Sequence, residues 1–241
     1  MAADPAALIR GLKLDLSETQ ERQLAALLAL LARDEHAPTA VCDVGAARDA
    51  HIADSLAALE VELVGAARDI ADVGSGAGFP GLPLAVALPL ARVYLVESQR
   101  RECEFLERAR AAGQVGNAHV VRARAEEWEE GMRANDVVLA RALAAQAVVL
   151  EYAAPLLRVG GALVDWRGRR TREEEAQAAG VASQLGLELG EIRRVRPFAQ
   201  ARERHLHVFV KVAETPSRFP RRAGVARKRP LGAAPSDRGH G

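Results

Sequence analysis

The sequence has 241 residues, which is enough for one ordinary domain with extensions or for two small ones. Hydrophobic residues make up 49% of it, so a sizeable core can form and a chain disordered throughout is excluded. No apolar run is long enough to span a membrane and none resembles a signal peptide, so we expect a soluble, cytoplasmic protein without membrane contact. Cys42 and Cys103 have no partners at metal-ligand spacing, so we expect neither a disulfide nor a metal site.

The net charge of +1 conceals an uneven distribution. From Ala213 onward there are seven basic and two acidic residues, a net charge of +5. The preceding 212 residues carry 26 basic and 30 acidic side chains, a net charge of −4. A mildly acidic body with a basic tail is typical of a protein that contacts a polyanion.

The first predicted helices are amphipathic. One covers 24–31, and the segment 17–20 has the pattern of a capped helix start. A second covers 51–64 and places Ile52, Leu56, Leu59 and Leu63 on one face. We interpret residues 1–65 as an N-terminal helical cap.

Strands and helices alternate after Gly65. The strands are expected at 70–73, 93–96, 118–121, 136–139, 162–166, 192–195 and 205–212, and the helices at 81–88, 100–112, 147–157 and 171–185. This order predicts an α/β, Rossmann-like fold with a mostly parallel seven-stranded sheet over 66–212. No helix separates the last two strands, which predicts an antiparallel hairpin at one edge. The tail over 213–241 is expected to be irregular.

A glycine-rich turn joins the first strand to its helix. Gly74, Gly76 and Gly78 allow positive φ and a close approach of backbone to ligand, and the helix N-terminus is expected to face an anionic group. Glu97 ends the second strand, where a carboxylate accepts hydrogen bonds from ribose hydroxyls. NAD-binding folds share such a turn, but the G-x-G-x-G spacing and its position some 70 residues into the chain favour S-adenosylmethionine, with a carboxylate as the anion.

Longer segments carry a more specific signal. They are D-V-G-S-G-A-G-F-P-G at 72–81, V-E-S at 96–98, R-x-x-x-F-L at 101–106, R-A-E-E at 124–127, A-R-A at 140–142, R-H-L at 204–206, T-P at 215–216, F-P-R-R at 219–222 and K-R-P-L at 228–231. In this order they resemble the bacterial 16S rRNA (guanine-N7)-methyltransferase family G, also called glucose-inhibited division protein B. The F-P-G ending of the loop and the tail are the most specific parts.

The resemblance implies a class I methyltransferase that transfers a methyl group from S-adenosylmethionine to N7 of one guanine, guanine 527, in 16S rRNA. It places Gly74 and Phe79 against the cofactor, and Ala125 and Glu126 beside its adenine. It places Arg141 near both the cofactor and the incoming base, so we predict a catalytic and cofactor-binding role for Arg141.

The N-terminal part matches the family less well. Ala50 stands where an arginine is usual before the segment 51–55, and A-P-T at 37–39 replaces N-L-T. Arg167-Gly168 replaces a usual lysine-glycine pair. We therefore expect the RNA contacts of the cap to differ, and we interpret His51 as a structural helix residue.

Guanine N7 carries a lone pair and no proton, so methylation needs alignment of the reactants and no general base. This agrees with a sequence that shows no triad and no metal cluster. The tail is expected to bind RNA phosphates, with Phe219 stacking on a base. Its predicted RNA-binding residues are Arg218, Arg221, Arg222, Arg227, Lys228 and Arg229.

Other functions stay open at this point. One is a class I methyltransferase that acts on another RNA, a protein or a small molecule. Another is a binding module with a vestigial cofactor loop, and a more remote one is an NAD oxidoreductase. The expected partner is 16S rRNA or the small ribosomal subunit, and the expected state is a monomer.

Overall fold

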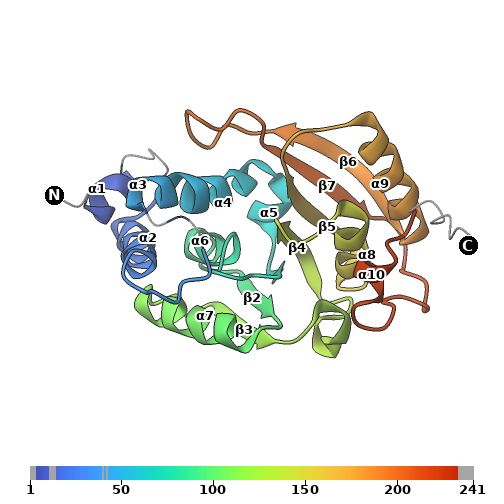
Figure 1. Cartoon of the computed structure of the whole chain (residues 1–241), viewed down its shortest axis with the longest axis horizontal. Helices are drawn as coiled ribbons and strands as arrows, with labels where there is room; N and C mark the ends of the chain where they lie inside the picture. Colours follow the sequence, from blue (N-terminus) through green and yellow to red (C-terminus); the bar gives the residue numbers. More distant parts are fainter. Residues whose placement is uncertain (1–3, 11–14, 40, 42, 233–241) are drawn as a thin grey trace, which may run out of the picture.

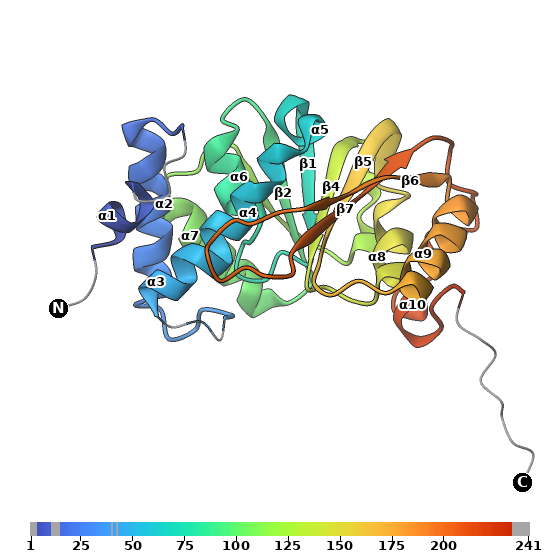
Figure 2. The same ribbon diagram turned by 90° about the horizontal axis from the view of Figure 1, so that it is seen from above.

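The computed structural model describes residues 4–10, 15–39, 41 and 43–232. Cys42 and the end of the tail, 233–241, lie outside the described residues. A single twisted sheet crosses the molecule, with helices on both faces (Figure 1). The helices nearest the N-terminus gather at one end, whereas α9, α10 and the last two strands lie at the other (Figure 2).

The sheet has seven strands in the order β3-β2-β1-β4-β5-β7-β6. The strands are β1 (Asp69–Val73), β2 (Arg92–Glu97), β3 (Ala118–Arg122), β4 (Asn135–Arg141), β5 (Leu157–Arg167), β6 (Leu187–Arg194) and β7 (His205–Lys211). The first five are parallel, and β7 runs antiparallel to both β5 and β6. The predicted fold and the antiparallel hairpin are therefore confirmed.

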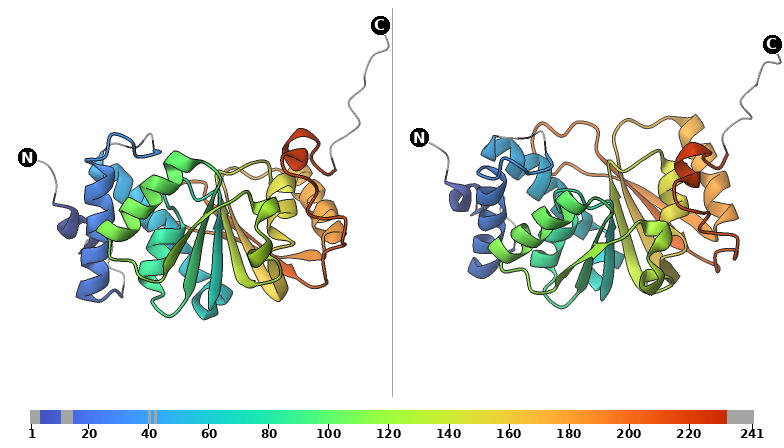
Figure 3. Two further views of the ribbon diagram at one scale, coloured as in Figure 1. Left: turned by 90° about the horizontal axis from the view of Figure 1, so that it is seen from below. Right: turned by 60° about the horizontal axis from the view of Figure 1, so that its bottom comes forward.

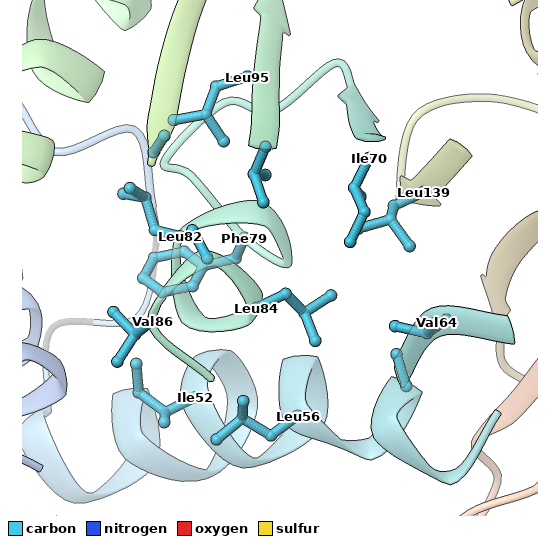
Figure 4. Close-up of a cluster of buried hydrophobic side chains, with 14 of the residues drawn as sticks. Ile52, Leu56, Val64, Ile70, Phe79, Leu82, Leu84, Val86, Leu95 and Leu139 are labelled. Carbon is cyan, nitrogen blue, oxygen red and sulfur yellow. The ribbon is translucent and has the colours of Figure 1, made fainter. Parts of the chain in front are cut away.

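Two groups of helices cover the sheet. On one face lie α1 (Pro5–Arg10), α2 (Glu18–Leu31), α3 (Val44–Ala47), α4 (Asp54–Leu56), α5 (Glu62–Ala66), α6 (Gly81–Ala87) and α7 (Arg100–Ala112). The other face is covered by α8 (Gln146–Ala153), α9 (Arg172–Gln184) and α10 (Val225–Lys228). Figure 4 shows how Ile52 and Leu56 pack toward Leu84 and Val86 of α6. The N-terminal helices thus share one apolar core with the sheet.

Two helix predictions need correction. The predicted helix at 51–64 is part of a longer helical stretch, which starts at Val44 and passes through π and 3-10 turns (Arg48–Ala53 and Ala57–Glu60). The stretch breaks at Val61, whose backbone is extended, so Leu63 leaves the apolar face and is 39% exposed. The predicted helix at 147–157 ends earlier, at Ala153. Ala154 still has helical φ and ψ, but Pro155 has no N–H with which to continue the helical hydrogen bonds. The predicted start of α2 is confirmed, since Ser17 and Gln20 form a capping box.

The tail is docked. After β7 the chain returns against α8 and forms the short helix α10 (Figure 3). Phe219 and Ala226 are buried in the same cluster as α8 and α9. The tail was expected to be irregular; its described residues contain one short helix, and their apolar side chains complete the core on this face.

Candidate functional site

The glycine loop leaves β1 at the point where the order of the sheet reverses. Its three glycines have φ of +70° at Gly74, +55° at Gly76 and +89° at Gly78. The N–H groups of Gly74 and Ser75 donate to the Val96 carbonyl at 2.9 and 3.2 Å, which ties the loop to β2. A Cβ added at Gly74 would clash with the Leu143 side chain. Only glycine suits this position, because both its backbone conformation and its surroundings exclude a side chain.

Asp72 holds the loop against the start of α6. Its Oδ2 accepts from Ser75 Oγ at 2.7 Å and from the Gly81 N–H at 2.9 Å. Burial raises the pKa of the Asp72 carboxyl to about 6, although these two hydrogen bonds lower it. The Leu82 N–H donates to the Gly78 carbonyl. The prediction that free N–H groups of this helix face an anion is therefore wrong for Gly81 and Leu82, which already have partners.

Glu97 sits at the end of β2 with its carboxylate fixed by backbone donors. Its Oε1 accepts from the N–H groups of Ser98 and Gln99 at 2.6 and 2.8 Å, and Oε2 accepts from that of Gly76 at 3.2 Å. Each carboxylate oxygen has two acceptor positions, and the Glu102 side chain also forms a hydrogen bond with this carboxylate. Glu97 is thereby oriented to accept a hydrogen bond from a ligand hydroxyl in the adjoining cavity, as a ribose would offer.

Glu102 is a cavity residue that the sequence analysis missed. It lies in the first turn of α7 and lines the same cavity as Glu97. Burial, together with the negative charge of Glu97, raises the pKa of the Glu102 carboxyl to about 7. The only signal in the sequence was the position of Glu102 in the first turn of the helix that follows β2. Its proximity to Glu97 could not be predicted, because it depends on how β2 meets α7.

The cavity has a volume of about 390 Å³ and lies over the carboxyl ends of β1, β2 and β4. It is lined by Val73, Gly74, Gly76, Val96, Glu97, Ser98, Gln99, Glu102, Ala123, Arg124, Ala125, Glu126, Ala142, Leu143, Tyr152 and Arg227. Parallel α/β sheets bind nucleotides and related ligands at such a switch point. Five predicted cofactor residues meet here: Gly74, Gly76, Glu97, Ala125 and Glu126. Gly78, Phe79 and Arg141 do not line this cavity.

The tail forms one wall of the cavity. The Gly224 N–H donates to Glu126 Oε1 at 2.9 Å, and Arg227 Nη2 donates to the Leu143 carbonyl at 3.2 Å. Arg227 and Tyr152 both line the cavity. The part of the chain predicted to bind RNA therefore also shapes this cavity.

Arg141 faces the N-terminal helices. Its Nη1 donates to the Ala50 carbonyl at 2.9 Å and to Asp54 Oδ2 at 3.1 Å, and its Nη2 lies 3.3 Å from His51 Nδ1. The guanidinium also lies 5.8 Å from the centre of the Phe79 ring. The predicted direct cofactor contact of Arg141 finds no support in this geometry, because the buried Asp54 and the His51 helix hold the guanidinium away from the cavity lining.

His51 stacks on Phe79, with ring centres 4.7 Å apart and the planes at 15°. Burial, and then the charge of Arg141, lowers the pKa of His51 to about 4, so the ring is neutral at pH 7. Arginine only donates, so Nδ1 accepts and Nε2 carries the proton toward Thr39 Oγ1 at 2.8 Å. Phe79 is 6% exposed and packs inward (Figure 4). The prediction that Phe79 contacts the cofactor is therefore not supported, whereas the structural interpretation of His51 agrees with these contacts.

Two of the tail residues predicted to contact RNA have other partners. Phe219 is 8% exposed within the core, so it cannot stack on a base in this conformation. Arg221 is paired with the buried Glu151, which fixes the tail to α8. The remaining predicted basic residues are exposed: Arg218, Arg222, Arg227, Lys228 and Arg229.

Membrane spans and metal-binding clusters are both absent from the described part of the chain. None of its helices combines the length and apolar character needed to cross a membrane. Nor do these residues include a group of three or more histidine, cysteine or acidic side chains arranged to hold a metal ion.

The reversed strand order, the hairpin edge and a glycine loop facing a strand-end carboxylate together define a class I S-adenosylmethionine-dependent methyltransferase. Solved structures agree with the fold. A point mutant of the 16S rRNA (adenine(1408)-N(1))-methyltransferase from Catenulisporales acidiphilia is similar, with a TM-score of 0.52 and 18% identity over 66% of this chain and 92% of that one. A predicted O-methyltransferase from Agrobacterium tumefaciens is similar with a TM-score of 0.52 and 23% identity, over 67% and 81% of the two chains.

The chain belongs to the rRNA small subunit methyltransferase G (GidB) family, whose family model matches residues 20–206. The ribosomal RNA small subunit methyltransferase G of Rubrobacter xylanophilus is 42% identical over 187 residues, covering 75% of this chain and 72% of the relative. The protein of the same description from Chloroflexus aggregans is 37% identical over 223 residues, covering 90% and 92%. The resemblance noted in the sequence is thereby confirmed, and the NAD-dependent and vestigial alternatives are set aside.

Proposed function

We propose that this protein transfers the methyl group of S-adenosylmethionine to N7 of a guanine in 16S rRNA, at the position corresponding to guanine 527. The observation that carries the proposal is the family match over residues 20–206, which spans the glycine loop and every strand of the sheet up to the start of β7. We further propose that the protein acts as a monomer in the cytoplasm, on the RNA or on the small subunit.

The cavity suits the proposed cofactor. Its volume of about 390 Å³ falls in the range of small-molecule sites, and the Glu97 carboxylate that lines it is a suitable acceptor for a ribose hydroxyl. Ala125 and Glu126 line the same cavity as Glu97, which supports the expectation that they lie beside the adenine. When bound, the cofactor supplies an electrophilic methyl group on a sulfonium.

Alignment is the main task left to the chain. Guanine N7 is nucleophilic without deprotonation, so no residue has to act as a general base. Glu97, the glycine loop, Leu143 and Arg227 of the tail all line the cavity and together would hold the methyl donor. Arg141 is a positioning residue in this mechanism, since it ties the end of β4 to the His51 helix and lies over Phe79 of the loop.

A direct assay tests the proposal. Purified protein and radiolabelled S-adenosylmethionine are incubated with small subunits, or with 16S rRNA, from cells that lack the enzyme. Label is expected in the RNA and in no ribosomal protein. Label in protein, or none despite calorimetric binding of the cofactor, would favour a class I methyltransferase with another substrate.

A further inference from the structure

A second cavity, of about 400 Å³, lies at the end of β5. It is lined by Ala145, Gln146, Ala147, Arg167, Gly168, Arg169, Arg170, Thr171, Glu174, Glu175, Gln177, Ala178, His207 and Pro230. Ala145 and Gln146 continue the loop whose earlier residues, Ala142 and Leu143, line the cofactor cavity. The loop at 142–146 therefore contributes to the lining of both cavities.

A buried polar network under this cavity has unused donors. Gln146 Nε2 donates to Asp165 Oδ2 at 3.1 Å and lies 3.0 Å from His207 Nδ1. Because the amide nitrogen donates, Nδ1 of His207 accepts and Nε2 carries the ring proton. Among the described residues nothing accepts from His207 Nε2, although the side chain is only 4% exposed.

Arg167 is a second residue of this network with a buried donor that has no acceptor among the described residues. Its Nε donates to Asp165 Oδ2 at 2.6 Å, whereas its buried Nη2 has no acceptor in the described part of the chain. A buried donor without a partner is costly, so two of them in one place indicate an acceptor supplied from outside the chain. Burial lowers the pKa of His207 to about 4, which keeps it a neutral donor.

The surface beside this pair is rich in arginine. A third, more open cavity of about 470 Å³ shares four lining residues with the second cavity: Arg169, Arg170, Thr171 and Glu175. Its other lining residues are Arg172, Arg194, Arg202, Glu203 and His205. Arg170 is paired with Glu175. Arg169 and Arg172 are exposed, and neither forms an ion pair with the described residues. We call the six arginines of the two cavities the arginine groove: Arg167, Arg169, Arg170, Arg172, Arg194 and Arg202.

We propose that the arginine groove binds the phosphodiester backbone of the RNA substrate, and that one phosphate accepts hydrogen bonds from His207 Nε2 and Arg167 Nη2. This inference rests on the proposed function. A phosphate offers several acceptor oxygens to converging donors, and a polyanion suits guanidinium groups spread along a groove. The groove is a second RNA-binding surface in addition to the basic tail. It lies where β5 ends and β7 begins.

The test measures how salt weakens RNA binding. Binding of a fluorescent fragment of 16S rRNA is followed by anisotropy at several salt concentrations, for the full chain and for Arg169→Gln/Arg172→Gln. The slope of log Kd against log salt is expected to fall by about one for each phosphate that the variant no longer neutralises. Arg68→Gln is the matched control, because Arg68 is exposed at the opposite edge, before β1.

A second variant tests the buried donor. His207→Phe is expected to weaken RNA binding about tenfold while calorimetry shows unchanged S-adenosylmethionine binding. Should His207→Phe fail to fold, the arginine pair still decides. An unchanged slope and affinity in the arginine double variant, with methylation intact, would overturn the groove and leave the proposed function standing. A wild-type protein that neither binds nor methylates rRNA would overturn both.

Discussion

The guanidinium of Arg221 donates to both carboxylate oxygens of Glu151, with Nε–Oε1 at 2.7 Å and Nη2–Oε2 at 2.5 Å. Glu151 is 1% exposed on α8, so this pair anchors the tail to the body of the protein. Gly224 and Arg227 follow it and reach the cofactor cavity. The tail is therefore expected to matter for cofactor binding as well as for RNA binding.

Replacing Arg221 by alanine leaves the buried Glu151 carboxylate without its partner. The free energy of unfolding is expected to fall by about 2–4 kcal/mol, and cofactor affinity is expected to fall with it because the cavity wall loosens. Urea denaturation and calorimetry measure the two effects. Arg222→Ala is the control, since Arg222 is an exposed neighbour. Equal stability of the two variants would show that the pair does not anchor the tail.

Gly74 is the most restricted position of the loop. Gly74→Ala is expected to reduce S-adenosylmethionine affinity at least tenfold, because the new Cβ displaces Leu143 from the cavity wall, and Gly74→Asp is expected to abolish binding. Gly160→Ala is the control for a strained glycine away from the cavity: Gly160 has φ +88°, a Cβ there meets no atom, and Gly160 does not line the cavity. Calorimetry should give normal affinity for Gly160→Ala. Normal affinity for Gly74→Asp would mean that the cofactor binds elsewhere.

Arg141 links stability to activity through Asp54. Arg141→Ala is expected to lower the free energy of unfolding by about 2–3 kcal/mol, since Asp54 is buried and keeps only Arg204, at 3.3 Å, as a cationic partner among the described residues. Adding Asp54→Asn removes the buried charge and is expected to restore part of the stability. Methyl transfer should stay low in the double variant, because the end of β4 is still detached from the His51 helix. Full turnover in the double variant would contradict the positioning role.

The raised pKa of Glu102 predicts that the stability of the protein depends on pH. Its pKa of about 7 in the folded protein exceeds the ordinary value of 4.5, so the folded state holds a proton that the unfolded state has released between these values. Stability is therefore lost as pH rises through this window. Glu102→Gln is expected to raise the melting temperature at about pH 8 and to change it little at about pH 4.

Glu104→Gln is the control for Glu102. Glu104 lies on the same helix, exposed and paired with Arg100, and this hydrogen bond lowers its pKa. It should show no gain in stability at high pH. A melting-temperature difference between Glu102→Gln and wild type that is the same at both pH values would contradict the interaction with Glu97.

Local patterns were enough to predict the order of the strands, the glycine loop and the position of Glu97 at the end of β2. They placed the start of β5 and of β6 five residues too late, at 162 and 192 instead of Leu157 and Leu187. The alternation of strands with helices dictates a parallel sheet, and the glycines mark the turn by their spacing. Long-range contacts were not accessible in the same way: Arg221 and Glu151 are 70 positions apart, and Gln146 and His207 are 61 positions apart. Arg141 was predicted to contact the cofactor, but the direction of its guanidinium depends on where the N-terminal helices pack.

Mass spectrometry of 16S rRNA tests the proposed function most directly. RNA from cells with and without the gene is digested to defined fragments, and the fragment that contains guanine 527 is analysed for 7-methylguanosine. We predict that the methyl group is absent without the gene and returns when the wild-type protein, but not Gly74→Asp, is supplied. An unchanged methyl group in cells without the gene would contradict the proposed function.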